Sequence, residues 1–267
     1  MSTRLNDLQQ QMEALRICVV VPTYNNQKTL SDVLNDILQY TTAVIVVNDG
    51  STDDTDLILE RYSGRIEVVS YMPNHGKGYA LKLGFKRAEE LNYKNAITID
   101  SDGQHFASEI KHFVDYSTEY PGAILIGQRT TEGEMPAKNT FANKFSNFWF
   151  TVQTARRLRD TQNGFRLYPL SVMKGMRPLT SRYEAELEML VRAAWRGIRI
   201  IPVATRIYYH PESERVTHFR PGKDFLRISL LNTFLTLLAI FYGYPAMAWR
   251  RLCPPAHTDY KSARACT

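Results

Sequence analysis

The fold of this chain is decided by the stretch Ala96-Ile97-Thr98-Ile99-Asp100-Ser101-Asp102-Gly103-Gln104-His105. Its first half is a short apolar run rich in β-branched residues, which is typical of a buried strand. Two aspartates follow at once, and an Asp-x-Asp pair can direct both carboxylates into one small volume that suits a hard divalent cation. The alternative is a turn in which Asp100 and Asp102 only cap the next helix. The choice depends on where the other polar turns of the chain fall.

Similar apolar runs occur along the first half of the chain, and segments of helical periodicity separate them. The predicted strands cover Ile17–Val21, Ala43–Val47, Ile66–Ser70 and Ile124–Gly127. The predicted helices cover Thr29–Tyr40, Leu57–Tyr62, Gly78–Leu91 and Ser108–Tyr116. Near-continuous apolar strands that alternate with helices predict an α/β fold with a mostly parallel central sheet flanked by helices.

Polar side chains follow three of these strands at the point where each strand ends. The Pro22-Thr23-Tyr24 turn follows the first strand, Asp49 follows the second, and Asp100 ends the run quoted above. Open α/β sheets bind ligands at the carboxyl ends of their strands. Polar turns at that one edge favour a ligand site containing Asp100 and Asp102 over a set of simple helix caps.

Two common nucleotide-binding motifs are missing from the sequence. No G-x-G-x-x-G follows the first strand and no G-x-x-x-x-G-K-[ST] occurs anywhere, which disfavours a dehydrogenase or a P-loop kinase. The Gly76-Lys77-Gly78 segment at a predicted helix start could hold a phosphate, because backbone N–H groups there point at an anion. A plain turn is the alternative for this segment.

Composition limits the class of protein. The 267 residues can form one large domain or one domain with an appendage, and 44% hydrophobic residues are enough for a sizeable core. The three cysteines have no metal-ligand spacing, so neither a disulfide framework nor a zinc site is expected. The net charge of +6 predicts an acidic partner such as a nucleotide or an anionic membrane. No nucleic-acid-binding motif accompanies the charge, and no nucleic acid is expected as a partner.

The end of the chain contains an apolar segment. Ile228–Trp249 has no charged residue, and as a helix it would be roughly 33 Å long, enough for a hydrocarbon core of about 30 Å. Polar residues fall on one helical face, and both flanks are basic, so neither side fixes a crossing. The sequence favours a helix lying in the membrane interface over a transmembrane span or a buried helix.

Two other segments of the second half bear on a partner. Lys138–Thr151 is predicted to be an aromatic helix whose rings either belong to the core or line an apolar acceptor groove. Residues 210–223 are rich in proline, glycine and basic side chains, which is typical of a loop that meets a membrane surface or a phosphate. A solvated basic loop is the alternative for residues 210–223.

Four motifs together carry a family resemblance. They are Val20-Val21-Pro22-Thr23-Tyr24-Asn25, Val47-Asn48-Asp49-Gly50-Ser51-Thr52-Asp53, the Gly76-Lys77-Gly78 helix start, and Asp100-Ser101-Asp102-Gly103-Gln104-His105. In this order and spacing the chain resembles glycosyltransferase family 2, in the branch of dolichyl-phosphate mannose and glucose synthases. The resemblance covers about Ile17 to Tyr209. It implies a GT-A type fold and an inverting transfer of sugar from a nucleotide-diphosphate sugar.

The resemblance also implies a donor site. The residues expected to bind the nucleotide sugar are Pro22, Tyr24, Asn25, Asp49, Lys77, Asp100 and Ser101. Asp100, Asp102 and Gln104 are expected to bind Mg²⁺ or Mn²⁺. Such an ion neutralises charge on the leaving diphosphate.

The expected catalytic residues are Glu186, Asp102 and Arg166. By resemblance, Glu186 falls at the family's general-base position in a helix running from Tyr183 to Gly197, and Glu184 is the other candidate for the base. The alternative is that both are surface glutamates, favoured in the first helical turn by the helix dipole. Arg166 lies in the segment that resembles the family's sugar-facing and acceptor-facing part, so we expect a phosphate contact; a surface arginine on a strand is the alternative. The residues expected to bind the acceptor are Arg129, Asn163, Arg215, His218 and Arg220.

The sequence therefore predicts a metal-dependent hexosyltransferase that moves a hexose from a nucleotide-diphosphate sugar to a membrane lipid acceptor, a polyprenyl phosphate above all. A hydroxyl of another lipid or saccharide is the alternative acceptor, and an inactive nucleotide- or membrane-binding module is the non-enzyme alternative. We expect a docking helix (1–16), a catalytic domain (17–209), a basic acceptor loop (210–223), a membrane-associated helix (224–251) and a tail (252–267). The expected place is the cytoplasmic face of a membrane, with peripheral or monotopic attachment. The sequence gives no indication of the oligomeric state.

Overall fold

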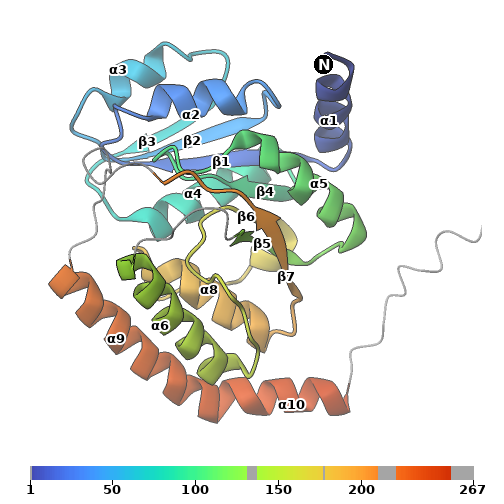
Figure 1. Cartoon of the computed structure of the whole chain (residues 1–267), viewed down its shortest axis with the longest axis vertical. Coiled ribbons are helices and arrows are strands. Elements are labelled where there is room, and N and C mark those ends of the chain that lie inside the picture. Colours follow the sequence, from blue (N-terminus) through green and yellow to red (C-terminus); the bar gives the residue numbers. More distant parts are fainter. Residues whose placement is uncertain (1, 131–136, 177, 210–220, 254–267) are drawn as a thin grey trace, which may run out of the picture.

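The computed structural model describes residues 2–130, 137–176, 178–209 and 221–253, and within them seven strands form one sheet (Figure 1). The strands are β1 (Ile17–Thr23), β2 (Val44–Asp49), β3 (Glu67–Tyr71), β4 (Asn95–Thr98), β5 (Ile124–Arg129), β6 (Arg166–Pro169) and β7 (Ile200–Thr205). Their order across the sheet is β3-β2-β1-β4-β6-β5-β7. The first four strands by sequence are mutually parallel, and β5 is parallel to β7.

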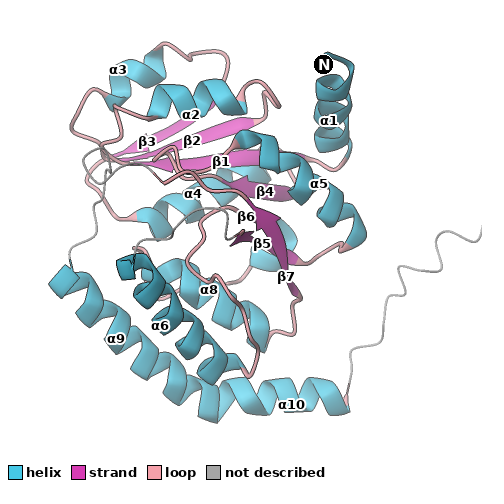
Figure 2. Ribbon diagram, in the orientation of Figure 1, coloured by secondary structure: helices cyan, strands magenta, loops and turns pink. Residues whose placement is uncertain are grey.

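Helices cover both faces of this sheet (Figure 2). They are α1 (Ser2–Ala14), α2 (Leu30–Ile37), α3 (Thr55–Glu60), α4 (Lys77–Glu90), α5 (Ile110–Glu119), α6 (Ala137–Thr154), α7 (Leu170–Met173), α8 (Glu184–Trp195), α9 (Pro221–Leu238) and α10 (Tyr244–Leu252). A 3-10 turn, Ala107–Glu109, leads into α5, and a π-helical turn, Ala239–Gly243, joins α9 to α10. The predicted α/β fold with a mostly parallel central sheet is confirmed.

Strand β1 lies in the middle of the sheet and contributes side chains to the hydrophobic cores on both of its faces. All seven of its residues are buried, and successive side chains point to opposite faces. Val19 and Val21 belong to the core under α1, α2 and α5, whereas Cys18 and Val20 belong to the core under α4 and α8. A strand buried on both faces explains why this run of sequence is apolar throughout.

Strand β6 runs against the direction of its neighbours. It pairs antiparallel with both β4 and β5, with Arg166 opposite Thr98 of β4. Thr98 Oγ1 donates a hydrogen bond of 2.7 Å to the carbonyl oxygen of Gly164. This pairing brings residues 163–166 to the edge where β4 ends and Asp100 begins the following loop.

Helix α4 packs closely on the sheet because Gly84 leaves room for it. A Cβ added at Gly84 would lie 2.5 Å from Val20 Cγ1 and 3.1 Å from Val47 Cγ2. Both neighbours are β-branched residues on buried strands, with little freedom to turn away. Gly84 therefore fixes the distance between α4 and the sheet.

We expect Gly84→Ala to lower the free energy of unfolding by about 1–3 kcal/mol through overpacking. The sign of this change in the free energy of unfolding is informative, because alanine in place of a helical glycine otherwise stabilises a helix by about 1 kcal/mol. Urea unfolding of the two proteins measures the difference. Lys82→Ala on the exposed face of the same helix is the control, with an expected change within about 0.5 kcal/mol. A G84A protein as stable as the parent would contradict this account of the packing.

Candidate functional site

The site is built around Lys77, at the first position of α4. Its Nζ lies 2.7 Å from Asp100 Oδ1 and 2.8 Å from Glu186 Oε2. The side chains of Lys77, Asp100 and Glu186 are 15%, 25% and 9% exposed. Burial alone would lower the pKa of Lys77, but the two carboxylates outweigh it and the pKa is raised. The lysine therefore stays charged between two carboxylates that come from distant parts of the chain.

The same balance acts on Asp100. Burial would raise the pKa of its carboxyl, but the neighbouring basic groups, Lys77 first among them, together outweigh that effect and the pKa lies below its usual value. Asp100 is therefore an anion that faces both the protein interior and the exposed edge of the sheet.

Glycines on two sides make this approach possible. A Cβ at Gly164 would lie 2.9 Å from both Lys77 Nζ and Asp100 Cγ, and a Cβ at Gly78 would lie 3.0 Å from the carbonyl oxygen of Arg182. Gly76, with φ +99°, packs against Arg182 and Ser181 in the same way. The glycines beside Lys77 thus allow the segment before α8 to sit on the start of α4, which brings Glu186 to Lys77.

Asp49 occupies the amino end of α4. Its carboxylate accepts hydrogen bonds from the backbone N–H groups of His75 and Gly76, each at 2.8 Å. Tyr71 Oη and Asn74 Nδ2 donate to it at 2.8 and 2.9 Å. The Gly76 N–H is thus used by Asp49, so a phosphate at the Gly76-Lys77-Gly78 segment would need other donors. A direct contact between Asp49 and a nucleoside would require one of these bonds to open.

Arg166 is buried and contacts Glu186. Its side chain is 0% exposed, so the interpretation as a surface arginine is wrong. The guanidinium donates to the carbonyl oxygens of Asn163 (2.7 Å), Thr161 (2.9 Å) and Glu186 (3.1 Å) and to the hydroxyl of Tyr168 (2.9 Å). Its Nη2 also lies 3.8 Å from Glu186 Oε1. With these donors engaged inside the protein, a phosphate contact by Arg166 would need a rearrangement.

The Asp-x-Asp loop offers oxygen ligands for a divalent cation. Asp100 is partly exposed, and Asp102 accepts a hydrogen bond from the Gln104 N–H at 3.0 Å. Within the described ranges no group of three or more His, Cys, Asp or Glu side chains has metal-binding geometry. Mg²⁺ is commonly held by one or two carboxylates together with phosphates and water, so two carboxylates and the Gln104 amide fit such an ion. The Lys77 ammonium beside Asp100 already shows that this place suits positive charge.

Ser101 ties two loops together. Its hydroxyl donates to the Pro22 carbonyl oxygen at 3.1 Å and accepts from Asn26 Nδ2 at 2.5 Å. Asn25, with φ +50°, accepts a bond from the Thr52 N–H at 2.7 Å and so joins the loops after β1 and β2. Tyr24 lies half-buried in the same turn. The expected donor-site residues Pro22, Asn25 and Ser101 therefore shape one continuous edge.

The expected acceptor residues fall in two groups. Arg129, at the end of β5, lies 2.8 Å from Asp160 Oδ2 through its Nε, and Asn163 lies beside Gly127. Arg215, His218 and Arg220 lie outside the described residues. Glu184 is half-buried in the first turn of α8, whereas Glu186 reaches the Lys77 cluster. The geometry therefore favours Glu186 over Glu184 as the site carboxylate.

Sequence reasoning gave no role to three residues of the site. His105 is 4% exposed with its Nε2 3.9 Å from Asp100 Oδ2, and burial lowers its pKa to about 4, so the ring is neutral at physiological pH. Gly164 provides the close approach to Asp100, and Asp160 pairs with Arg129. All three lie in segments that the sequence had singled out: His105 ends the Asp-x-Asp stretch, and Asp160 and Gly164 lie in the segment of Arg166 that resembles the family's sugar-facing and acceptor-facing part. Their contacts with Asp100 and Arg129 become visible only when β6 is placed against β4 and β5.

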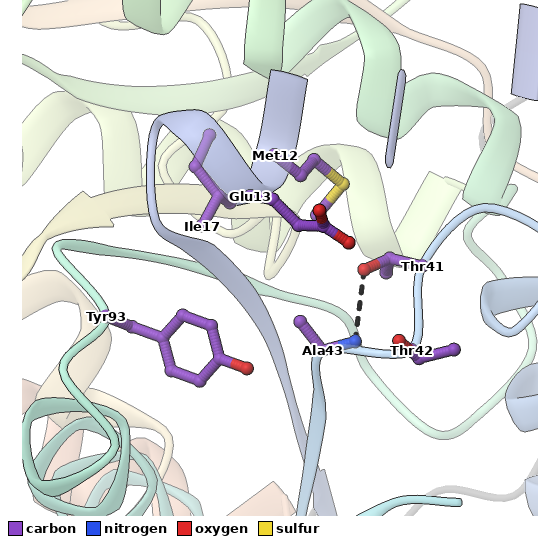
Figure 3. A pocket seen from close by; sticks show the side chains of 7 residues that line it. All are labelled: Met12, Glu13, Ile17, Thr41, Thr42, Ala43 and Tyr93. Carbon is purple, nitrogen blue, oxygen red and sulfur yellow. Dashed lines mark hydrogen bonds between the residues drawn. The ribbon is translucent and has the colours of Figure 1, made fainter. Parts of the chain in front are cut away.

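A small cavity lies at the other end of the strands (Figure 3). It measures about 130 Å³ and is lined by Met12, Glu13, Ile17, Thr41, Thr42, Ala43 and Tyr93. These residues come from α1, the start of β1 and the segment before β2. Sites for ligands of drug-like size usually measure about 300–1,000 Å³, so this cavity is too small for a nucleotide sugar.

Comparison with known proteins gives a family match. The family model described as Glycosyl transferase family 2 matches residues 18–176. The protein named Glycosyltransferase AglJ from Haloferax volcanii is 29% identical over 212 residues, which cover 78% of this chain and 68% of that protein. UDP-N-acetylglucosamine–dolichyl-phosphate N-acetylglucosaminyltransferase from Methanococcus voltae is 27% identical, over 81% of this chain and 96% of that protein. Human dolichyl-phosphate beta-glucosyltransferase is also 27% identical, over a match that covers 80% of this chain and 75% of that protein.

Solved structures share the fold. Glucosyl-3-phosphoglycerate synthase from Mycobacterium tuberculosis, in complex with Mg²⁺ and UDP, superposes with a TM-score of 0.65 at 20% identity, covering 88% of this chain and 82% of that one. Its complex with Mn²⁺, UDP-glucose and phosphoglyceric acid superposes with a TM-score of 0.64 at 20% identity, and the match covers 88% of this chain and 83% of that one. At this identity the likeness concerns the fold alone, which agrees with the expected GT-A type architecture.

We expect Lys77→Met to destabilise the protein strongly, because it leaves the Asp100 and Glu186 carboxylates without the ammonium between them. Removing one partner of a fully buried pair costs about 3–5 kcal/mol, and the partial exposure here reduces the expected loss to about 2–3 kcal/mol. Urea unfolding measures it. Lys82→Met on the exposed face of α4 should change stability by less than about 0.5 kcal/mol. Equal stability of the two variants would show that Lys77 does not hold the cluster together.

Proposed function

The chain belongs to glycosyl transferase family 2, and on that premise we propose that it transfers a hexose from a nucleotide-diphosphate sugar to a polyprenyl phosphate, with inversion at the sugar carbon. The observation that carries the proposal is the cluster of Lys77, Asp100 and Glu186 beside Asp102 at the carboxyl edge of the sheet. This is the edge at which open α/β sheets bind their ligands. Asp100 and Asp102 offer carboxylates for a cation, and Lys77 offers a positive charge for a diphosphate.

The choice of acceptor is supported by the relatives and by chemistry. Relatives from Methanococcus voltae and human carry names that specify dolichyl phosphate. A phosphate monoester has a second pKa near 6, so it is already an anionic nucleophile at neutral pH. It therefore needs no general base. This fits a site whose carboxylate, Glu186, has its Oε2 engaged by Lys77.

Asp100, Asp102 and Gln104 would hold Mg²⁺ or Mn²⁺, which when bound neutralises charge on the leaving diphosphate. Lys77 supplies a further positive charge at the start of α4 and holds Asp100 in place. Arg166 fixes the first turn of α8 through the Glu186 carbonyl oxygen. Arg129, held by Asp160, brings a guanidinium to the end of β5, where it would meet the acceptor phosphate.

A hydroxyl acceptor on another lipid or saccharide is the second candidate. It is favoured by the position of Glu186, a carboxylate in the first turn of α8 that reaches the same cluster. A hydroxyl needs its proton removed as it attacks, and a positioned base contributes about 10²- to 10⁴-fold to that step. In this alternative Glu186 is the general base. The two acceptor classes are separated by the second variant below.

The proposed place of action is the cytoplasmic face of a membrane, with peripheral or monotopic attachment. It is supported by the net charge of +6 and by one stretch of the described helices, Arg227–Leu252, that is long and apolar enough to cross a bilayer by length and composition. A lipid acceptor would be met at such a surface.

We expect Asp102→Asn to lower metal-dependent release of nucleotide from the donor by about 10²- to 10³-fold, the usual cost of removing one fixed charge-stabilising group. The assay measures nucleotide release from UDP- and GDP-sugars with Mn²⁺ and a polyprenyl phosphate. Chelation of the metal should lower the parent enzyme's rate to the level of the variant. Asp115→Asn, at an exposed ion pair on α5, is the matched control with unchanged rate. An Asp102→Asn enzyme with the parent's rate would rule out its role at the metal.

Glu186→Gln separates the two acceptors. The amide keeps an oxygen that can accept from Lys77, so we expect less than about a tenfold loss with a lipid phosphate, which needs no base. With a hydroxyl acceptor the same change should remove about 10²- to 10⁴-fold. Rates with polyprenyl phosphate and with the matching polyprenol give the comparison, and Glu184→Gln serves as control. A large loss on the phosphate would contradict base-free transfer.

A further inference from the structure

The stretch from Arg227 to Leu252, called here the C-terminal arm, is fastened to the catalytic domain along one face. Leu231, Leu235 and Ala239 are 6%, 0% and 0% exposed and belong to the core shared with α4 and α8. Four positions further on, Gly243 meets the indole of Trp195, and a Cβ there would lie 2.6 Å from Trp195 Cε2. The inner face of α9 and of the π-helical turn is therefore part of the protein interior, whereas α10 has no buried residue.

Polar groups fix the same contact. Trp195 Nε1 donates to the Gln153 carbonyl oxygen at 2.8 Å, and Gln153 Nε2 donates to Asn232 Oδ1 at 3.1 Å. Towards the end of the arm, Tyr244 donates to the Val152 carbonyl oxygen and Arg250 to that of Trp195. A bilayer crossing would require these bonds to break and Trp195 to be exposed, or the polar domain to enter the hydrocarbon. The arm in this structure is bound along the domain instead (Figure 1).

The outward face of the arm is apolar. Phe241, Leu252 and Trp249 are 78%, 80% and 67% exposed. The remaining large exposed apolar side chains of the arm are Leu230, Phe234, Leu237, Ile240, Tyr242 and Tyr244. Helix α6, which packs beside α9, adds Phe141 and Phe148, at 68% and 59% exposed. Scattered single apolar residues are ordinary on a protein surface, but a run of this size marks an interaction surface.

The charges of the same region have one sign. The segments 141–159 and 227–252 contain seven basic residues and no aspartate or glutamate, although 27 of the 267 residues of the chain are acidic. The basic residues are Lys144, Arg156, Arg157, Arg159, Arg227, Arg250 and Arg251. Burial and the neighbouring Arg251 lower the pKa of Arg156, so arginines of the two segments lie close together. Asp160 and Asp224 lie just outside these two segments. Within the segments, an apolar face accompanied by cations and by no acidic residue is complementary to an anionic lipid surface.

We propose that the C-terminal arm lies flat on an anionic bilayer, with its outward side chains in the boundary between headgroups and acyl chains, and does not cross it. Tyr242, Tyr244 and Trp249 have the amphipathic rings that suit this depth. The proposal deepens the proposed function and rests on it, since an enzyme that takes a lipid phosphate must work at a bilayer surface. Vesicle binding is measured without any donor, so a failure of catalysis and a failure of docking give different results.

The first test is co-sedimentation of the full chain with vesicles of phosphatidylcholine alone or with 30% phosphatidylglycerol. We expect binding to the anionic vesicles that weakens with salt, and a partition coefficient about tenfold lower for Phe241→Glu. Arg251→Glu should lower binding about tenfold on anionic vesicles only. Leu57→Glu, at a 55% exposed leucine on α3, is the matched control with unchanged binding.

Three outcomes of this test would overturn the proposal. The first is absence of vesicle binding by the parent protein, and the second is binding that Phe241→Glu leaves unchanged. The third is a dimer in lipid-free solution, seen by light scattering, that Phe241→Glu dissociates while vesicle binding persists. The occupant of the face would then be a second copy of the chain.

The second test separates a flat arm from a spanning one. Cys253 is exposed at the end of α10 and Cys18 is buried, so Cys266→Ser leaves one accessible thiol among the described residues. The protein is bound to sealed vesicles and treated outside with a membrane-impermeant maleimide. We expect the same labelling of Cys253 before and after detergent. Labelling that appears only after detergent would show that the arm crosses the bilayer.

Discussion

The ammonium group of Lys77 holds together three segments that are far apart in the sequence. It joins the start of α4 to Asp100 after β4 and to Glu186 in α8, and each contact is a short ion pair. Several neighbouring residues make these contacts possible. Gly76 and Gly78 let the segment before α8 approach, Gly164 leaves room beside Asp100, and Arg166 fixes the backbone of Glu186 from the other side. The carboxyl edge of the sheet is thus organised around an internal cation.

This arrangement suits a reaction in which negative charge develops on a leaving diphosphate. In a site that excludes part of the water, the attraction between a cation and a nearby negative charge is screened less than in bulk solvent. Asp100 has two roles in it, since it pairs with Lys77 and belongs to the Asp-x-Asp pair that would hold a divalent ion. The position of Lys77 therefore bears on the stability of the edge and, in the proposed function, on the activation of the donor.

Much of this fold could be predicted from sequence, because its strands are nearly continuous apolar runs and its polar turns fall at one edge. The family resemblance, carried by four motifs in order, is confirmed by the match to residues 18–176. The reversed direction of β6, the burial of Arg166 and the bridge from Lys77 to Glu186 depend on contacts between distant segments, and no local pattern encodes them. Gly76-Lys77-Gly78 is the clearest case: its sequence leaves a phosphate-binding turn and a plain turn open, whereas in the structure both glycines allow close packing against the segment before α8.

The central claim is that the Lys77 edge serves sugar transfer to a lipid phosphate. The most direct test is one assay with the full-length enzyme in lipid vesicles, in which a panel of nucleotide sugars is offered with polyprenyl phosphate or with the unphosphorylated polyprenol. The account predicts that at least one nucleotide sugar releases its nucleotide in step with formation of a glycosylated lipid phosphate, while the polyprenol gives no product. Turnover with the polyprenol alone, or no transfer from any donor to the phosphate, would contradict it.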